Sequence, residues 1–420
     1  MLLTRFVTNI RPHKFVVTVV VFAFISCGAA RDLRNVTEPK NPETCTILKA
    51  TGGDDTKLIQ EALDSCAKGK AVALSSETFY SGPLTIPSGV SLLVDQGVTL
   101  KAIPDPLLYD LGAKTCGTLD DFGVGCKAFI TINGAKSSGI YGKGTIDGQA
   151  NVTMTGKNKT WWELSNEAVT AHNYQNNPML VQINDSVDIT VYQVSLINSP
   201  FYTLTAYGTN GWTVWGITIL APPTARNTDG IDPIGCQNVT IAHCYVSMGD
   251  DNVAIKALTG PSRHISVLNN HFDEGRGVSI GSEVNHGISD VYVANVTLNG
   301  SVNGIHIKSN TYRGGHIRDI TYDNLCVYRA QHPIYLEMDY VHLHGNRTPE
   351  FRRISINNMK ALKKGEYIIY GLSASNPVEV TLNNVHVVKG SVFLERFANI
   401  TGKFEVEDST GNKCGYAGID

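Results

Sequence analysis

Short alternating apolar pairs, each following a polar turn, recur along the second half of the chain. The last residues of these pairs are 25, 27, 26, 26, 27, 36 and 24 positions apart. Alternation with a period of two, bounded by Gly, Asn and Asp, predicts short β-strands. Strands that recur at a nearly fixed spacing predict the stacked coils of a solenoid. The pairs are Val187/Ile189, Trp212/Val214, Val239/Ile241, Ile265/Val267, Val291/Val293, Ile317/Ile320, Ile354/Ile356 and Val378/Val380.

Two solenoid architectures have a repeat of this length, the parallel β-helix and the leucine-rich repeat. The Leu-x-x-Leu-x-Leu pattern of the second is absent, and Val, Ile and Asn dominate the repeats. A parallel β-helix is therefore predicted. Its strands pair in parallel from coil to coil, so one position of the coil forms a long ladder, and the solvent side of a ladder makes an elongated groove. A groove of that shape suits a polymer.

The regions before the regular repeats predict a cap and a loop. Residues Thr56 to Ala67 have their apolar side chains on one face, which predicts a helix that caps the solenoid, with Asp54 or Asp55 at its N-terminus. Residues 150–178 interrupt the period and are rich in Asn and Thr, and we interpret them as a long loop. The neighbouring Trp161 and Trp162 in this segment could either stack on sugar rings or fill a core.

The N-terminus has the pattern of a secretory signal peptide. Basic residues precede an apolar run, Phe15 to Ile25, and small residues follow it up to Ala30. The run is shorter than the ~20 residues that a membrane span requires. We therefore expect a signal peptide over 1–30 and one secreted domain over 31–420, with no membrane association after cleavage.

Composition and cysteine content agree with a secreted globular protein. Of 420 residues, 42% are hydrophobic and 17% are charged, and the formal net charge is −3, which gives no reason to expect nucleic acid as a partner. Eight of nine cysteines lie beyond the signal segment, which suggests disulfides. The sequence has no Cys-x-x-Cys pair of the kind that binds zinc. Proximity in sequence suggests the pairs Cys45–Cys66, Cys116–Cys126, Cys236–Cys244 and Cys326–Cys414, although other connectivities are open. Nine Asn-x-Ser/Thr sites could carry glycans.

Three carboxylates fall about one coil apart. Asp229 follows Asn227-Thr228, and the adjacent pair Asp250 and Asp251 follows at a distance close to one repeat. Each aspartate alone could cap a turn. Together on one face, they could supply the protonated acid and the carboxylate base that cleavage of a glycosidic bond needs, because neighbouring acids raise one another's pKa.

Cationic residues follow on the next two coils. Arg276 lies about one coil after Asp250, and His306 and Lys308 lie about one coil beyond Arg276. His306 and Lys308 are at alternate positions of a strand, so they share a face. Such a patch suggests an anionic substrate, or it could only balance the aspartates. Lys256 could also line the groove, and Tyr340 lies about one coil beyond Lys308.

Several motifs together resemble the polygalacturonases of glycoside hydrolase family 28. They are Gly144-Thr145-Ile146-Asp147-Gly148-Gln149, the run from Thr224 to Pro233, the run from Gly249 to Lys256, Ser279-Ile280-Gly281-Ser282-Glu283 and Ile307-Lys308-Ser309. The resemblance implies a right-handed parallel β-helix and inverting hydrolysis of α-1,4 links in pectin or polygalacturonate, without a metal or other cofactor. The run from Thr224 is most similar to endo-acting enzymes, and we expect a monomer.

The resemblance also implies a role for each site residue. Asp250 matches the general acid, and Asp229 and Asp251 match the carboxylates that hold and activate water. Lys308 matches a binder of the substrate carboxylate, and Tyr340 matches a tyrosine that contacts substrate.

Two positions depart from the family pattern. Arg276 stands where the family has His, and His306 stands where it has Arg. A guanidinium beside Asp250 would favour the ionised carboxylate and lower its pKa. This departure leaves open a pectin-binding protein without activity, or a hydrolase of a modified uronic-acid polymer. A lyase that uses Ca²⁺ and an arginine base is a further alternative.

Overall fold

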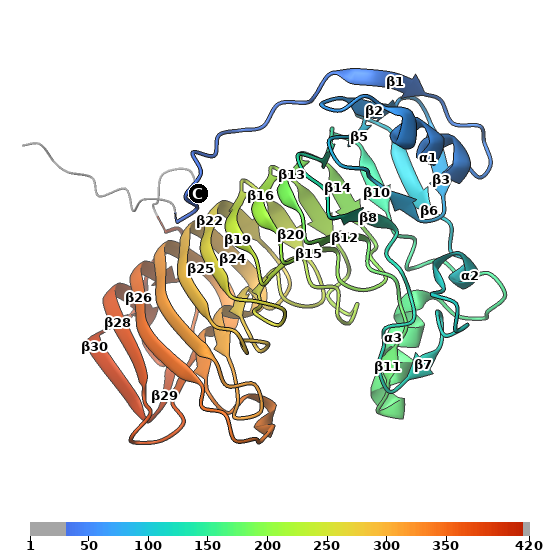
Figure 1. Cartoon of the computed structure of the whole chain (residues 1–420). Coiled ribbons are helices and arrows are strands. Elements are labelled where there is room, and N and C mark those ends of the chain that lie inside the picture. Colours follow the sequence, from blue (N-terminus) through green and yellow to red (C-terminus); the bar gives the residue numbers. More distant parts are fainter. Residues whose placement is uncertain (1–30, 415–420) are drawn as a thin grey trace, which may run out of the picture.

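The computed structural model describes residues 31–414, and the chain winds into a parallel β-helix built of three ladders (Figure 1). The predicted signal peptide lies outside the described residues. Every ladder pairs its strands in parallel, as the sequence predicted. The fold class therefore agrees with the repeat of alternating apolar pairs.

The first ladder runs from the capped end of the solenoid to its last coil. It contains β1 (Thr44–Leu48), β2 (Ala71–Leu74), β5 (Ser91–Val94), β9 (Gly139–Tyr141), β13 (Val187–Tyr192), β16 (Asn210–Trp215), β19 (Gln237–Ala242), and the first parts of β22 (Ser262–Phe272), β24 (Ile288–Lys308), β25 (His316–Glu337), β26 (Glu350–Ala361), β28 (Val378–Val388) and β30 (Ala398–Glu407).

The second ladder begins with short strands and continues in the later parts of the long strands β22, β24, β25, β26, β28 and β30. The short strands are β3 (Thr78–Ser81), β6 (Thr99–Ala102), β10 (Thr145–Asp147), β14 (Ser195–Ile197), β17 (Thr218–Leu220) and β20 (Tyr245–Ser247).

The third ladder, which we call the site ladder, carries the predicted acids and cations. It contains β4 (Leu84–Thr85), β8 (Ile130–Asn133), β12 (Val181–Asn184), β15 (Leu204–Tyr207), β18 (Ile231–Ile234), β21 (Val253–Ile255), β23 (Val278–Ile280), the ends of β24 and β25, β27 (Glu366–Tyr370) and β29 (Val392–Arg396).

The core is a column of apolar side chains stacked from coil to coil. Ile189 lies beside Trp212, which lies beside Val239 and then Ile265, and all four are fully buried. Each coil thus covers the apolar side chains of the one before it, which a single coil could not bury. The first alternating pair differs from the others, because Val187 lies opposite Asn210 and is exposed while Ile189 is buried.

Helices occur at the beginning of the chain and beside the site ladder. The helix α1 (Thr56–Ser65) buries Ile59 and Leu63 against the first coils, which confirms the predicted cap. The segment before β1 runs along the outside of the coils (Figure 1), where the backbone N–H of Asp32 donates to Ser266 Oγ at 3.0 Å. None of the helices in residues 31–414 is long and apolar enough to cross a bilayer.

The segment 150–178 is not the continuous loop that we predicted. It contains α3 (Trp161–Ala171), which begins with a capping box between Thr160 and Glu163. Trp161 is buried against the core, so for this residue the core-filling alternative is correct. A further short helix, α2 (Pro106–Tyr109), and the two-stranded sheet of β7 (Leu119–Asp120) and β11 (Tyr174–Gln175) lie on the same side, projecting from the coils (Figure 1).

Three of the four suggested disulfides are present, and one is not. Cys45–Cys66, Cys116–Cys126 and Cys326–Cys414 are bonded. Cys236 and Cys244 are instead buried thiols. Cys236 lies between β18 and β19 and Cys244 between β19 and β20, so the two occupy different corners of one coil. Proximity in sequence was misleading here because a whole strand separates the two corners.

Candidate active site

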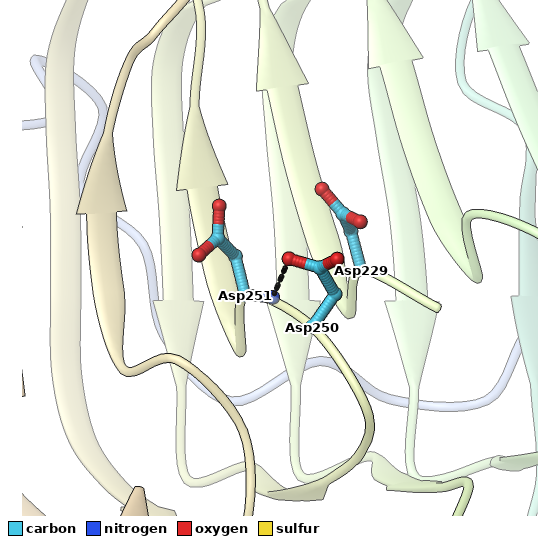
Figure 2. A group of neighbouring side chains, drawn as sticks. All are labelled: Asp229, Asp250 and Asp251. Atoms are coloured by element: carbon cyan, nitrogen blue, oxygen red, sulfur yellow. Dashed lines mark hydrogen bonds between the residues drawn. The ribbon is translucent and has the colours of Figure 1, made fainter. Parts of the chain in front are cut away.

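The three aspartates meet in front of the site ladder. Asp229 precedes β18, and Asp250 and Asp251 precede β21, which lies beside β18 in the ladder. One carboxylate oxygen of each lies within 4.8 Å of an oxygen of both others. Figure 2 shows the three side chains converging, with the backbone N–H of Asp251 donating to Asp250 Oδ1 at 3.0 Å. The prediction that these acids share one face is confirmed.

Close backbone packing positions the turn that carries Asp250 and Asp251. A Cβ atom at Gly249 would lie 1.9 Å from Ala225 O, so only glycine fits there. The buried Asn252 donates from its amide to Val246 O and Glu274 O and accepts from Gly277 N–H at 2.8 Å. These bonds hold the turn between the coils before and after it, which fixes both carboxylates.

Each acid is paired with one cation. Lys256 Nζ lies 3.0 Å from Asp229 Oδ2, Lys308 Nζ lies 2.8 Å from Asp251 Oδ2, and Arg276 Nε lies 3.6 Å from Asp250 Oδ1. The positive charge beside the acids therefore comes from side chains of the protein itself. A set of three carboxylates could also ligate a divalent cation, but two of these are already hydrogen-bonded to buried ammonium groups. This arrangement disfavours the Ca²⁺-dependent lyase alternative.

The three acids differ in their tendency to hold a proton. Burial, opposed by Lys256 and reinforced by the other two acids, raises the pKa of Asp229 to about 7. Burial and the neighbouring Asp251 raise the pKa of Asp250 despite the opposing charge of Arg276. Burial would raise the pKa of Asp251 too, but Lys308 and the hydrogen bonds that Asp251 accepts lower it. Asp251 therefore ionises most readily of the three acids, whereas Asp229 and Asp250 hold a proton to higher pH than a free carboxyl group does.

The effect of Arg276 on Asp250 is smaller than the sequence suggested. Its guanidinium does lie beside Asp250 and does oppose protonation, but burial and Asp251 outweigh it, so the pKa of Asp250 stays above its usual value. The arginine side chain is 43% exposed, so solvent screens its charge. Asp250 can therefore still act as a proton donor.

His306 lies behind Asp251 rather than beside Asp250. Ser279 Oγ donates to Asp251 Oδ1 at 2.6 Å and lies 3.3 Å from His306 Nδ1. Burial and the nearby Lys308 hold the pKa of His306 well below its usual range, so the ring is neutral. Asn303 Nδ2 lies 3.1 Å from the same ring nitrogen, so His306 Nδ1 accepts from this amide while Ser279 gives its own proton to Asp251. His306 is therefore a neutral neighbour of Ser279 and does not take the place of a cation next to Asp250.

Tyr340 closes one side of the site. It begins the short 3₁₀ helix η1 (Tyr340–His342), its ring centroid lies 5.4 Å from Lys308 Nζ, and it packs edge-on against His306. The structure thus brings together all of the residues predicted for the site. Trp162 lies outside this group, half-buried, with its indole donating to Ser199 O at 3.0 Å.

Sequence reasoning missed a fourth buried carboxylate. Asp232 is fully buried on β18, and its Oδ2 lies 3.6 Å from Lys256 Nζ. Tyr202 covers the same ammonium, with its ring centroid 4.3 Å away. The available signal was an acid between the apolar residues Ile231 and Pro233, shortly after Asp229. If this short run is a strand, Asp232 faces the same side as Lys256 on the next coil.

Comparison with known proteins agrees with this site. Residues 68–407 match the model of glycosyl hydrolases family 28. The chain is 43% identical to an endo-polygalacturonase of Pectobacterium carotovorum subsp. carotovorum over 90% of this chain and 95% of that one. It is 33% identical to a polygalacturonase of Ralstonia solanacearum over 89% of this chain and 85% of that one. The solved polygalacturonase from Erwinia carotovora ssp. carotovora superposes with a TM-score of 0.85, covering 88% of this chain and 100% of that one at 42% identity. The chain therefore belongs to glycosyl hydrolases family 28.

Proposed function

We propose that this protein is an endo-polygalacturonase that hydrolyses the α-1,4 links between galacturonosyl units of polygalacturonate. The observation that carries the proposal is the cluster of three acids, each held against its own cation, on the site ladder of a family 28 chain. The 43% identity to an endo-polygalacturonase over most of both chains supports the same activity. Cationic groups beside the acids suit a polymer that carries a carboxylate on every sugar.

The protonation states suggest a role for each acid. Asp250 donates its proton to the oxygen of the leaving sugar, and the ionised Asp251 with Asp229 holds and activates the attacking water. Lys308, Arg276 and Tyr340 form the wall that binds substrate, and the buried His306, which the sequence placed in this group, supports the wall from behind Asp251. Lys308 is the group that meets a substrate carboxylate, since its ammonium has further protons to donate beside its bond to Asp251.

The spacing of the acids bears on how the water is held. Carboxyl groups of inverting glycosidases are usually ~6.5–9.5 Å apart, whereas oxygens of these three acids lie within 4.8 Å of one another. The inversion that family membership implies therefore requires water bound across Asp229 and Asp251, to one side of Asp250. Attack from that side on an α-linked sugar gives the β-anomer first.

The test is release of reducing ends from polygalacturonate between about pH 4 and 8, with products separated by size and their first anomer read by NMR. We expect short oligomers, the β-anomer, no new ultraviolet absorbance, and the same rate in EDTA. Activity should fall as the pH rises far enough to ionise the general acid Asp250, whose pKa is raised by burial and by Asp251, so the fall should come at a higher pH than for a free carboxyl group.

Each alternative has its own outcome in this test. Ultraviolet absorbance that disappears in EDTA would show a lyase. Binding without any release, from folded protein, would show a pectin-binding protein. Release only from a modified uronic-acid polymer would change the substrate, and galacturonate monomer as the first product would contradict endo action.

Replacing Arg276 by His should move the alkaline limb of kcat/KM to higher pH. The guanidinium lowers the pKa of Asp250, so its removal raises that pKa, and an acid that must be protonated stays active to higher pH. The control is Arg276→Lys, which keeps a positive charge and should leave the limb nearly in place. A limb that moves to lower pH in Arg276→His would contradict this assignment.

Secretion and a monomeric state belong to the same proposal. The three disulfides support an oxidising, extracellular location, which agrees with the leader predicted over 1–30. We expect a monomer because a long polymer needs a groove that is open along its length. Gel filtration would test this expectation.

A further inference from the structure

We propose that a pocket next to the acid cluster is an additional subsite for one galacturonosyl unit of the polymer, with Arg226 binding its carboxylate and Phe122 and Tyr174 contacting its ring. This subsite rests on the proposed function. The pocket has a volume of about 130 Å³, and its walls also include Gln175, Tyr202 and Asn227.

The two exposed aromatic rings are held on a rigid arm. The strands β7 and β11 pair in antiparallel fashion, and the disulfide Cys116–Cys126 closes the loop that carries β7. Asp120 Oδ1 accepts from the backbone N–H groups of Phe122 and Gly123 at 2.8 and 2.7 Å. The tip is therefore fixed before any ligand binds, so little ordering entropy would be lost on binding.

The exposure of these rings needs an explanation. Phe122 is 76% exposed and Tyr174 is 59% exposed, although both line the same pocket. Two large aromatic side chains held rigidly in water are unfavourable for the folded protein alone. The apolar faces of a sugar ring would cover them, and aromatic side chains supply a large contact area for that purpose.

Arg226 gives the pocket its charge. Within residues 31–414, its guanidinium makes one long hydrogen bond, 3.4 Å to Ser165 O, and has no carboxylate partner. The buried Gln175 donates to Asn227 Oδ1, and its own Oε1 has no partner in the described structure. A guanidinium without a carboxylate partner, with an unpartnered amide oxygen in the same pocket, fits a sugar that presents both a carboxylate and hydroxyl groups.

The pocket is continuous with the acids. Tyr202 lines it and also covers Lys256 Nζ at 4.3 Å, and Lys256 is bonded to Asp229 at 3.0 Å. Asn227, another lining residue, precedes Asp229 in the same turn. A polymer chain that crosses the acid cluster would therefore place a neighbouring sugar in the pocket.

The test compares a long and a short substrate in variants of the pocket. With Arg226→Gln, we expect kcat/KM for a hexagalacturonide to fall by about 10- to 100-fold, as loss of a charge-assisted hydrogen bond implies. Phe122→Ala should lower it by about 2- to 10-fold. The value for the shortest oligomer that the enzyme cleaves should not change. Arg226→Lys should recover part of the loss, and Arg263→Gln, at an exposed position on β22, should cause none.

An equal loss for long and short substrates, or no loss for the hexagalacturonide, would overturn the subsite. Calorimetric binding of the hexagalacturonide to the unaltered protein and to Arg226→Gln separates this inference from the proposed function. If the unaltered protein hydrolyses nothing but binding still weakens in the variant, the activity fails and the subsite stands. Equal binding by both would contradict the subsite.

Discussion

Replacing Asp250 by Asn should lower kcat on polygalacturonate by about 100- to 10,000-fold, the contribution of a general acid, while the polymer still binds. The amide keeps the size of the side chain and can still accept from the backbone N–H of Asp251. It cannot supply a proton to the leaving oxygen. Reducing-end assays would measure the loss, and binding of a hexagalacturonide would show that the groove remains intact.

The same variant distinguishes Asp250 from Asp229 as the donor, since both acids have a raised pKa. A dinitrophenolate leaving group on an oligogalacturonide departs without protonation. Asp250→Asn should therefore cleave this substrate at nearly the normal rate, whereas Asp229→Asn should not, because the water remains inactive. Asp188→Asn, on the first ladder, is the control for the substitution itself. The opposite pattern would exchange the two roles.

The fold could be predicted because a solenoid repeats one local rule. Alternating apolar residues, turn residues and a near-constant spacing report directly on strands that stack. Prediction from the sequence failed where local alternation alone does not decide which side chain is buried or where a helix forms. Val187 and Ile189 have the same alternation, and only pairing with the neighbouring coil shows which of the two is buried. The capping box that begins α3 lies inside an Asn- and Thr-rich segment, whose composition masked it.

The site could be predicted only to the level of a shared face. The spacing of about one coil places Asp229 beside Asp250 and Asp251, and it places Arg276, His306 and Lys308 on the coils beyond them. It does not decide which cation meets which acid, because that depends on small differences in position between coils. The same limit hid the hydrogen bond from Ser279 to Asp251 and the place of His306 beside it.

Replacing Lys256 by Met should lower the free energy of unfolding by about 3–5 kcal/mol at neutral pH, as breaking a buried ion pair does, and should also remove most activity. The ammonium bonds Asp229 Oδ2 at 3.0 Å and lies 3.6 Å from Asp232 Oδ2, and all three side chains are buried. Without it, the two carboxylates remain in the interior with no opposite charge beside them. Urea unfolding would measure the stability, and Lys136→Met, at an exposed position, is the control.

The loss in Lys256→Met should depend on pH in a definite direction. Lys256 lowers the pKa of Asp229 and Asp232, so its removal raises both further above their values in the unfolded chain. The folded variant then binds more protons than the unfolded chain, and its stability must fall as the pH rises. The destabilisation should therefore be smaller near pH 5 than near pH 8, and adding Asp232→Asn should recover part of it. An equal loss at both pH values would mean that Lys256 acts through packing and not through its charge.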